Sequence, residues 1–254
     1  MTPGELPEPR GHLFFEGDDR LEGILEWPEG PGDGAAAPHV AGGVVVAHPH
    51  PLYGGTMAQP VVHRVAQACR ERGFGSLRFN FRGVGRSSGR YSGTEEYRDV
   101  EAALAFLRGR LAAGPAEALG ASGASTSADA LSPVPGPKST LGLAGYSFGS
   151  RMAALAAGTA AVPVDALALI ALVVEWEGLS RGALDGLARF RGPVLAVCGE
   201  LDDLAPPDVV EETLQGLGID FRLAVVTGTG HFFEHRQREV GELVAAFFAE
   251  RLGD

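Results

Sequence analysis

The sequence predicts an α/β fold, in which a mainly parallel β-sheet carries helices on both faces and an antiparallel hairpin at its start. Two observations lead to this prediction. From residue 40 onwards, short apolar segments alternate with helical patterns, which is the order of repeated βαβ units. Before them, residues 12–15 and 20–27 alternate apolar and polar side chains around Gly17, Asp18 and Asp19, as the strands of a half-exposed hairpin do.

After the hairpin, the first half of the chain contains two strand patterns, each followed by a helical pattern. They cover residues 40–47, 60–73, 75–81 and 94–112. The first strand is continuously apolar, as expected for a strand that is covered on both faces. Gly73 should end the first helix, and Thr94 should cap the second, with Glu95 and Glu96 in its first turn.

The second half of the chain repeats this alternation up to its C-terminal end. Strand patterns cover residues 140–146, 166–174, 192–199 and 221–226. Helical patterns follow Phe148, cover residues 179–190, follow Asp208 and cover residues 232–252. The last helix has one apolar stripe, formed by Val240, Leu243, Val244, Phe247 and Phe248.

Residues 114–139 interrupt this order. They are almost entirely Ala, Gly, Ser, Pro and Thr, and so few bulky apolar residues cannot bury enough surface to offset the entropy of ordering. We therefore predict one domain over residues 1–254 with a mobile insertion at about 114–139. A chain of this length can bury a sizeable core within a single domain.

Charge and hydropathy limit the partners and the location of the protein. The formal net charge of -11 would repel nucleic acids and anionic membranes. The longest apolar run, residues 166–174, is far shorter than the about 20 residues that a membrane span needs, and the N-terminus lacks the pattern of a secretory signal. We expect a cytoplasmic protein without nucleic-acid or membrane partners, and the oligomeric state, including a homodimer, stays open.

The two cysteines show no ligand spacing for zinc. Cys69 lies in a helical pattern and Cys198 in an apolar strand pattern, and neither suggests a disulfide framework. Both are expected to be small residues of the core.

Residues 145–149, Gly-Tyr-Ser-Phe-Gly, match the pattern G-x-S-x-G between a predicted strand and a predicted helix. At such a sharp turn, side chains at positions 145 and 149 would clash with the neighbouring strand or helix, which explains the two glycines. Ser147 is therefore a candidate nucleophile. The backbone N–H of Phe148, at the positive end of the helix dipole, is a candidate donor to a developing oxyanion. The alternative is that Ser147 only caps the helix.

A nucleophilic serine needs a histidine base, which in turn needs a carboxylate to orient it. Both residue types follow later strands. Glu200, Asp202 and Asp203 come after the strand that ends near residue 199, and His231 comes after the next strand. This order of serine, acid and histidine accompanies a serine on such a turn. Position alone leaves the three acids as candidates, and a loop histidine bonded to backbone remains the alternative for His231.

A second oxyanion donor is expected in the loop after the strand at residues 40–47, where the sequence from His48 is HPHPLYGG. Prolines have no N–H group, which narrows the candidates. By position, the backbone N–H of His50 comes first, followed by those of Leu52 and Tyr53. The alternative is that the segment is simply a rigid loop.

Five segments together resemble a known family. They are HPHPLYGGTM from His48, RFNFRGVGRSSG from Arg78, GYSFGS from Gly145, the acidic turn at Gly199 and GTGHFF from Gly228. The combination resembles the α/β-hydrolase superfamily, and within it the small, capless, dienelactone-hydrolase-like serine hydrolases of bacteria. The resemblance covers nearly the whole chain. Two departures are visible: dienelactone hydrolases proper carry cysteine at the position of Ser147, and the insertion at 114–139 is foreign to the pattern.

The resemblance implies both a fold and an activity. The fold would be an α/β-hydrolase fold with a mostly parallel, eight-stranded sheet and no large cap domain. The activity would be hydrolysis of carboxylic esters or related small acyl compounds by Ser147, His231 and an acid, without a metal or cofactor. In the resembled family the acid stands three residues after the glycine that ends its strand, which gives Asp202.

The same resemblance places lids between the strand ending near residue 174 and the strand starting at residue 192, an interval that is short here. The site should therefore be open. We expect it to be lined by apolar side chains, namely Leu52, Tyr53, Phe148, Trp176, Phe232 and Phe233.

Three other hypotheses remain. Residues 231–235 match H-x-x-E-H, in which His231 and His235 would hold zinc beside Glu234, but Gly228 and Gly230 indicate a loop where that motif needs a helix. The glycines at positions 83, 85 and 89 suggest a nucleotide-binding turn, but the third comes one place too late. A non-catalytic binding module with the same fold is the third hypothesis.

Overall fold

The structure is a computed structural model that describes residues 11–29, 40–113, 140–175 and 180–253. Within these residues, eight strands form one sheet in the order β1-β2-β4-β3-β5-β6-β7-β8. Strand β1 pairs antiparallel with β2 and β2 antiparallel with β4, while the remaining strands are parallel. The predicted fold class, including the N-terminal hairpin, is confirmed. The strands are β1 (His12–Glu16), β2 (Arg20–Glu26), β3 (Gly42–Ala47), β4 (Phe74–Phe79), β5 (Thr140–Tyr146), β6 (Ala166–Ile170), β7 (Val194–Gly199) and β8 (Phe221–Val226).

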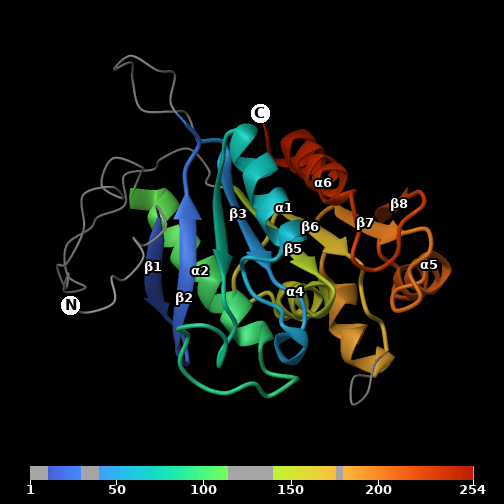
Figure 1. The fold of residues 1–254 in the computed structure, drawn as a ribbon, viewed down its shortest axis with the longest axis horizontal. Coiled ribbons are helices and arrows are strands. Elements are labelled where there is room, and N and C mark those ends of the chain that lie inside the picture. The colour runs from blue at the N-terminus through green and yellow to red at the C-terminus, as the bar shows by residue number, and fades with distance from the viewer. Residues whose placement is uncertain (1–10, 30–39, 114–139, 176–179, 254) are drawn as a thin grey trace, which may run out of the picture.

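Helices cover both faces of the sheet (Figure 1). On one face, α1 (Pro60–Glu71) packs against α6 (Gln237–Leu252), and on the other α2 (Tyr97–Ala113) packs against α4 (Phe148–Thr159). Helix α5 (Pro207–Gly216) lies beside β7 and β8, and the 3₁₀ helix η2 (Arg181–Arg189) packs against α4. Because two layers of helices enclose the sheet, strands β3, β4, β6 and β7 are buried along their whole length, which explains the continuous apolar runs of β3, β6 and β7.

Two predicted helix starts are wrong, both by placing the helix too early. Thr94 does not cap a helix, because the Ser92 hydroxyl accepts from the N–H groups of residues 94 and 95, and the Glu96 carboxylate accepts from those of residues 92 and 93. These bonds form a separate turn, and α2 begins at Tyr97. Helix α6 begins five residues later than predicted, since Phe233 and His235 have positive φ angles of 50° and 63°.

Two other predicted elements are shorter or of another type. The strand predicted at residues 166–174 ends at Ile170, because Ala171 has a φ of 47° and turns the chain away. The helical pattern at residues 179–190 is the 3₁₀ helix η2. The insertion predicted at 114–139 lies outside the described residues.

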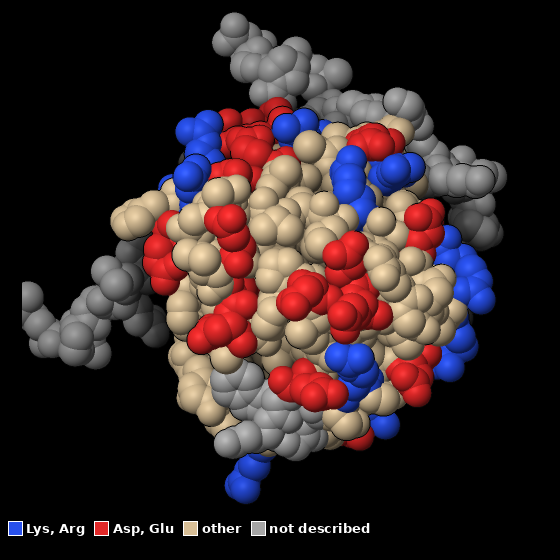
Figure 2. Space-filling view, turned by 90° about the vertical axis from the view of Figure 1, so that its right-hand side faces the viewer, with Lys and Arg blue, Asp and Glu red and all other residues tan. Residues whose placement is uncertain are grey.

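Figure 2 shows that acidic side chains are more widespread than basic ones on the side of the molecule that carries α5 and β8. This distribution agrees in sign with the formal net charge of -11. None of the helices in the described part of the chain is long and apolar enough to cross a membrane.

Candidate active site

The turn between β5 and α4 holds Ser147 in an unusual backbone conformation, with a φ of 56° and a ψ of -118°. Such a positive φ is strained for a residue with a side chain and needs support from its surroundings. That support requires close approach: a Cβ atom at Gly145 would lie 2.2 Å from the Gly149 oxygen, and one at Gly149 would lie 2.4 Å from the His48 oxygen. As predicted, a side chain at either position would clash with neighbouring backbone, which explains why glycine flanks the turn.

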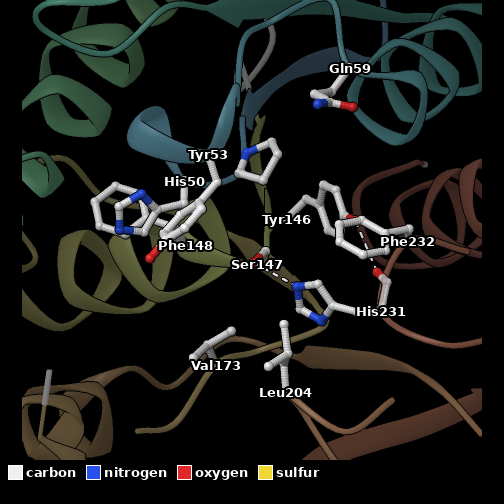
Figure 3. A pocket seen from close by; sticks show the side chains of 11 residues that line it. His50, Tyr53, Gln59, Tyr146, Ser147, Phe148, Val173, Leu204, His231 and Phe232 are labelled. Carbon is white, nitrogen blue, oxygen red and sulfur yellow. Dashed lines mark hydrogen bonds between the residues drawn. The ribbon is translucent and has the colours of Figure 1, made fainter. Parts of the chain in front are cut away.

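Ser147, His231 and Asp202 come together in one chain of hydrogen bonds. The Ser147 Oγ lies 2.8 Å from the His231 Nε2 (Figure 3). The Nδ1 of the same ring lies 2.9 and 3.0 Å from the two Asp202 carboxylate oxygens. Because a carboxylate accepts, Nδ1 carries the ring proton, and Nε2 is left with a lone pair for the serine hydroxyl proton. All three side chains are buried.

The neighbouring acids have different partners. Of the three acids, Asp202 bonds to the His231 ring, and its Oδ1 also accepts from the N–H groups of Leu204 and Ala205, which orients the carboxylate. Asp203 is exposed. Glu200 instead accepts from the Gly228 N–H at 2.8 Å and so ties the acid loop to the histidine loop, a role that the sequence pattern did not indicate.

Tyr146 supports the histidine from the strand side. Its hydroxyl donates to the backbone carbonyl of His231 at 2.9 Å. Burial raises the pKa of Tyr146 above its usual value, so the hydroxyl keeps its proton and remains a donor. The residue before the nucleophile therefore helps to fix the loop that carries the histidine.

Two backbone N–H groups are candidates for an oxyanion hole. Phe148 is the first residue of α4, and an N–H group there has no partner within the helix. In the loop after β3, the N–H of Leu52 donates to the His50 Nδ1 at 3.2 Å and that of Tyr53 to the His50 oxygen at 3.1 Å. Both are thus used within the 3₁₀ turn η1 (Pro51–Tyr53), which leaves the N–H of His50 as the second candidate.

A pocket of about 350 Å³ opens above Ser147 (Figure 3). It is lined mainly by apolar and aromatic side chains, from Pro49, His50, Tyr53, Gln59, Tyr146, Ser147, Phe148, Val173, Leu204, His231 and Phe232. The rings of Tyr53 and Phe148 each lie 4.9 Å from that of His50, so one wall is an aromatic cluster. Val173 and Leu204 lie on another side of the Ser147–His231 pair.

The pocket differs in part from the lining that the sequence suggested. Tyr53, Phe148 and Phe232 line it, whereas Leu52 points to solvent and Phe233 is fully buried. Trp176 lies outside the described residues. Pro49, Gln59, Tyr146, Val173 and Leu204 were missed. The signals for two of them were their places in sequence, because Val173 follows the end of β6 and Leu204 comes just after the acid.

The backbone around His231 does not have the conformation that the zinc hypothesis requires. His231 lies in a turn, and α6 begins only at Gln237. His235 has a φ of 63°, so the two histidines are not one helical turn apart on a common face. Both nitrogens of His231 are already bonded to protein groups.

A sheet of this topology, with a serine on the turn between β5 and α4, defines an α/β hydrolase. Between β6 and β7, the described residues form only η2 and no separate lid domain. The model of the dienelactone hydrolase family matches residues 90–250. The chain belongs to this family, and it is a capless hydrolase.

Solved structures of similar proteins cover the chain almost completely. An α/β serine hydrolase homologue from Coxiella burnetii has 28% identity and a TM-score of 0.74, over 96% of this chain and 100% of that chain. A serine hydrolase without lid from Xanthomonas campestris has 25% identity and a TM-score of 0.72, over 98% of this chain and 97% of that chain. In sequence, an uncharacterised protein of Rickettsia prowazekii (strain Madrid E) is 37% identical over 98 residues, and the match spans 38% of this chain and 38% of that relative's length.

Proposed function

We propose that this hydrolase cleaves carboxylic esters or related acyl compounds through an acyl-enzyme on Ser147. The observation that carries the proposal is the chain of hydrogen bonds from Asp202 through His231 to Ser147 at the floor of an apolar pocket. In this proposal His231 is the general base and Asp202 orients it. The N–H groups of Phe148 and His50 form the oxyanion hole.

The reaction would proceed in two balanced steps. As the Ser147 oxygen bonds to the substrate carbonyl carbon, its proton passes to His231 Nε2, and the carbonyl oxygen becomes an oxyanion that accepts from the two N–H groups. The imidazolium then gives this proton to the departing alkoxide, which leaves as the alcohol. Water repeats the sequence on the acyl-enzyme and releases the acid, returning the proton to Ser147.

The lining of the pocket favours an uncharged substrate group. None of its described lining residues is Lys, Arg, Asp or Glu, so a charged group would lose its hydration without gaining an ionic partner. A pocket of about 350 Å³ is within the usual size of sites for small molecules. The proposed substrates are therefore small, apolar acyl compounds that reach the site directly from solvent.

The test is Ser147→Ala, measured on p-nitrophenyl esters of increasing acyl length. We expect kcat to fall by roughly 10⁴-fold or more, because the nucleophile is lost. Ser150→Ala, on the same helix, is the matched control, since its buried hydroxyl has no hydrogen-bond partner in the described part of the chain. Labelling of the wild type by a fluorophosphonate probe should also require Ser147.

Two outcomes would contradict the proposal. If a chelator abolished ester hydrolysis while Ser147→Ala kept it, the protein would be a metallohydrolase. If the folded protein neither turned over any ester nor reacted with the probe, the binding-module hypothesis would replace the enzyme.

A further inference from the structure

His48 is a buried histidine that the reaction above does not use. It follows β3 directly and opens the HPHP segment of the loop that carries the second proposed oxyanion donor. Its side chain is fully buried and does not line the pocket, so it cannot touch a substrate there. A buried imidazole at this place nevertheless needs a partner for each of its nitrogens.

The partners of the His48 ring define one tautomer. The backbone N–H of Phe81 donates to Nε2 at 3.1 Å, so Nε2 carries a lone pair. The proton is therefore on Nδ1, which donates to the Pro49 carbonyl oxygen at 2.6 Å. Burial lowers the pKa of His48 to about 4, so the ring stays neutral at ordinary pH and keeps this single tautomer.

The carbonyl that His48 holds belongs to the peptide unit whose other end is the His50 N–H. Peptide units are planar, and none of the described bonds is cis, so the C=O and the N–H of this unit point in opposite directions. Fixing the Pro49 oxygen therefore fixes the direction of the His50 N–H. Both Pro49 and His50 line the pocket.

One close approach constrains this peptide unit, and a second constrains the peptide unit before it. A Cβ atom at Gly55 would lie 2.1 Å from the Pro49 oxygen, so the chain passes directly against the carbonyl. The His48 carbonyl itself touches Gly149 at the nucleophile turn. The loop is thus seated on the first turn of α4, beside the N–H of Phe148.

We propose that His48 is a positioning residue of the oxyanion hole: its Nδ1–H turns the Pro49–His50 peptide so that the His50 N–H points at the developing oxyanion. This rests on the proposed function above. His48 never contacts the substrate. Its effect falls on the transition state, because the hydrogen bond from the His50 N–H is strongest when negative charge develops on the substrate oxygen.

Two amide substitutions separate the two hydrogen bonds of the ring. Asn places an amide N–H near the position of Nδ1 and can still donate to Pro49, while Gln, one bond longer, can accept from Phe81 but reaches past Pro49. We expect kcat of His48→Gln to fall roughly 10- to 100-fold, with KM nearly unchanged. This fall should not exceed the fall in kcat that follows complete removal of one oxyanion donor. His48→Asn should stay within about fivefold of the wild type, as a rescue by the retained donor.

A transition-state analogue gives a readout that loss of stability does not move. Phenylboronic acid forms a tetrahedral adduct with the active serine, so its inhibition constant should rise in His48→Gln by the same factor as kcat/KM falls. In His48→Asn both should stay near the wild-type values. Equal kcat and equal inhibition for His48→Gln and the wild type would overturn the proposal, as would Gln outperforming Asn.

Nitrogen NMR of the wild type provides a test that needs no variant to fold. The His48 ring should show a proton on Nδ1 and none on Nε2, unchanged from pH 8 down to about pH 5, because the pKa of about 4 lies below this range. A proton on Nε2 would overturn the proposal. Failure of the His48 proposal can be told apart from failure of the proposed function. If the proposed function failed, the wild-type protein would show no Ser147-dependent turnover, and the His48 proposal would fail with it.

Discussion

The floor and the rim of the pocket are built in opposite ways, although they share the same loops. We call Ser147, Asp202 and His231 the floor, and the exposed side chains of Tyr53 and Phe232, which line the pocket, together with that of their neighbour Leu52, which lies outside it, the rim. The floor side chains are buried and each bonds to a fixed partner. The rim side chains are 69%, 68% and 64% exposed. His231 and Phe232 are neighbours in sequence, so a single turn of the chain carries one buried floor residue and one exposed rim residue.

The difference shows where accuracy is needed. Proton transfer at the floor requires heavy atoms within hydrogen-bond distance and a defined tautomer, so burial and backbone bonds hold each group. The rim has to offer only apolar area, which tolerates movement and substitution because the hydrophobic effect has no preferred direction. We therefore expect effects on activity to shrink from floor to rim, even between adjacent residues.

The largest effect should come from Asp202→Asn. The amide would favour the wrong tautomer of His231, and kcat should fall by about 10⁴-fold. Asp203→Asn, the matched control one residue away, removes an exposed charge and should change kcat/KM by less than about tenfold. Both variants are measured on one short-chain p-nitrophenyl ester. The reverse ranking would show that Asp203 orients the histidine and that floor and rim cannot be told apart by burial.

An intermediate effect should come from Arg151, a buried residue of α4 that holds one wall of the pocket. Its Nη1 donates to the Val174 oxygen at 2.7 Å and its Nη2 to the Ser180 oxygen at 2.5 Å. Val174 is next to Val173, which lines the pocket, and Ser180 directly precedes η2. In Arg151→Met these carbonyls lose charged donors, which should cost about 3 kcal/mol and lower Tm by roughly 6–12 °C.

The same variant tests whether a buried residue can act on the shape of the pocket without touching the floor. We expect the ratio of kcat/KM for a long over a short acyl ester to rise by at least about threefold, because a loosened Val173 leaves more room. Arg222→Met is the control, since Arg222 makes an exposed ion pair with Glu250 that should contribute less than about 1 kcal/mol. An unchanged ratio in Arg151→Met, with only the Tm lowered, would limit Arg151 to a stabilising role.

The sequence predicted the strands well because each is a short run of apolar or alternating residues between turn residues. The limits of β5 and β8 agree with the predicted 140–146 and 221–226. The start of α6 was missed because Phe233 and His235 have positive φ angles, and a periodic pattern of apolar residues does not record backbone angles. The start of α2 was missed because the side chains of Ser92 and Glu96 bond backbone groups just before the helix.

The candidate site could be predicted only where its residues follow strand ends. Ser147, Asp202 and His231 each do, and parallel strands bring these ends to one edge of the sheet. Glu200 and Tyr146 were missed because they bond to the backbone of Gly228 and His231, which are distant in sequence. A local sequence pattern does not indicate such a bond. Leu52 was expected in the pocket for its apolar side chain, but η1 turns it to solvent.

The smallest effects should come from the rim, where Leu52 and Tyr53 form a matched pair of adjacent, equally exposed residues of η1. Tyr53 lines the pocket and packs its ring 4.9 Å from that of His50, whereas Leu52 is outside the lining. Tyr53→Ala should raise KM by roughly three- to tenfold, as expected for the loss of about 1 kcal/mol of partly exposed apolar contact, and should leave kcat within about threefold. Leu52→Ala should change neither constant by more than about twofold, because it removes only solvent-exposed surface. Steady-state kinetics of both variants on one apolar ester decide the point. A large fall in kcat for Tyr53→Ala would mean that its ring also fixes the His50 peptide, and the boundary between floor and rim would then run through η1 itself.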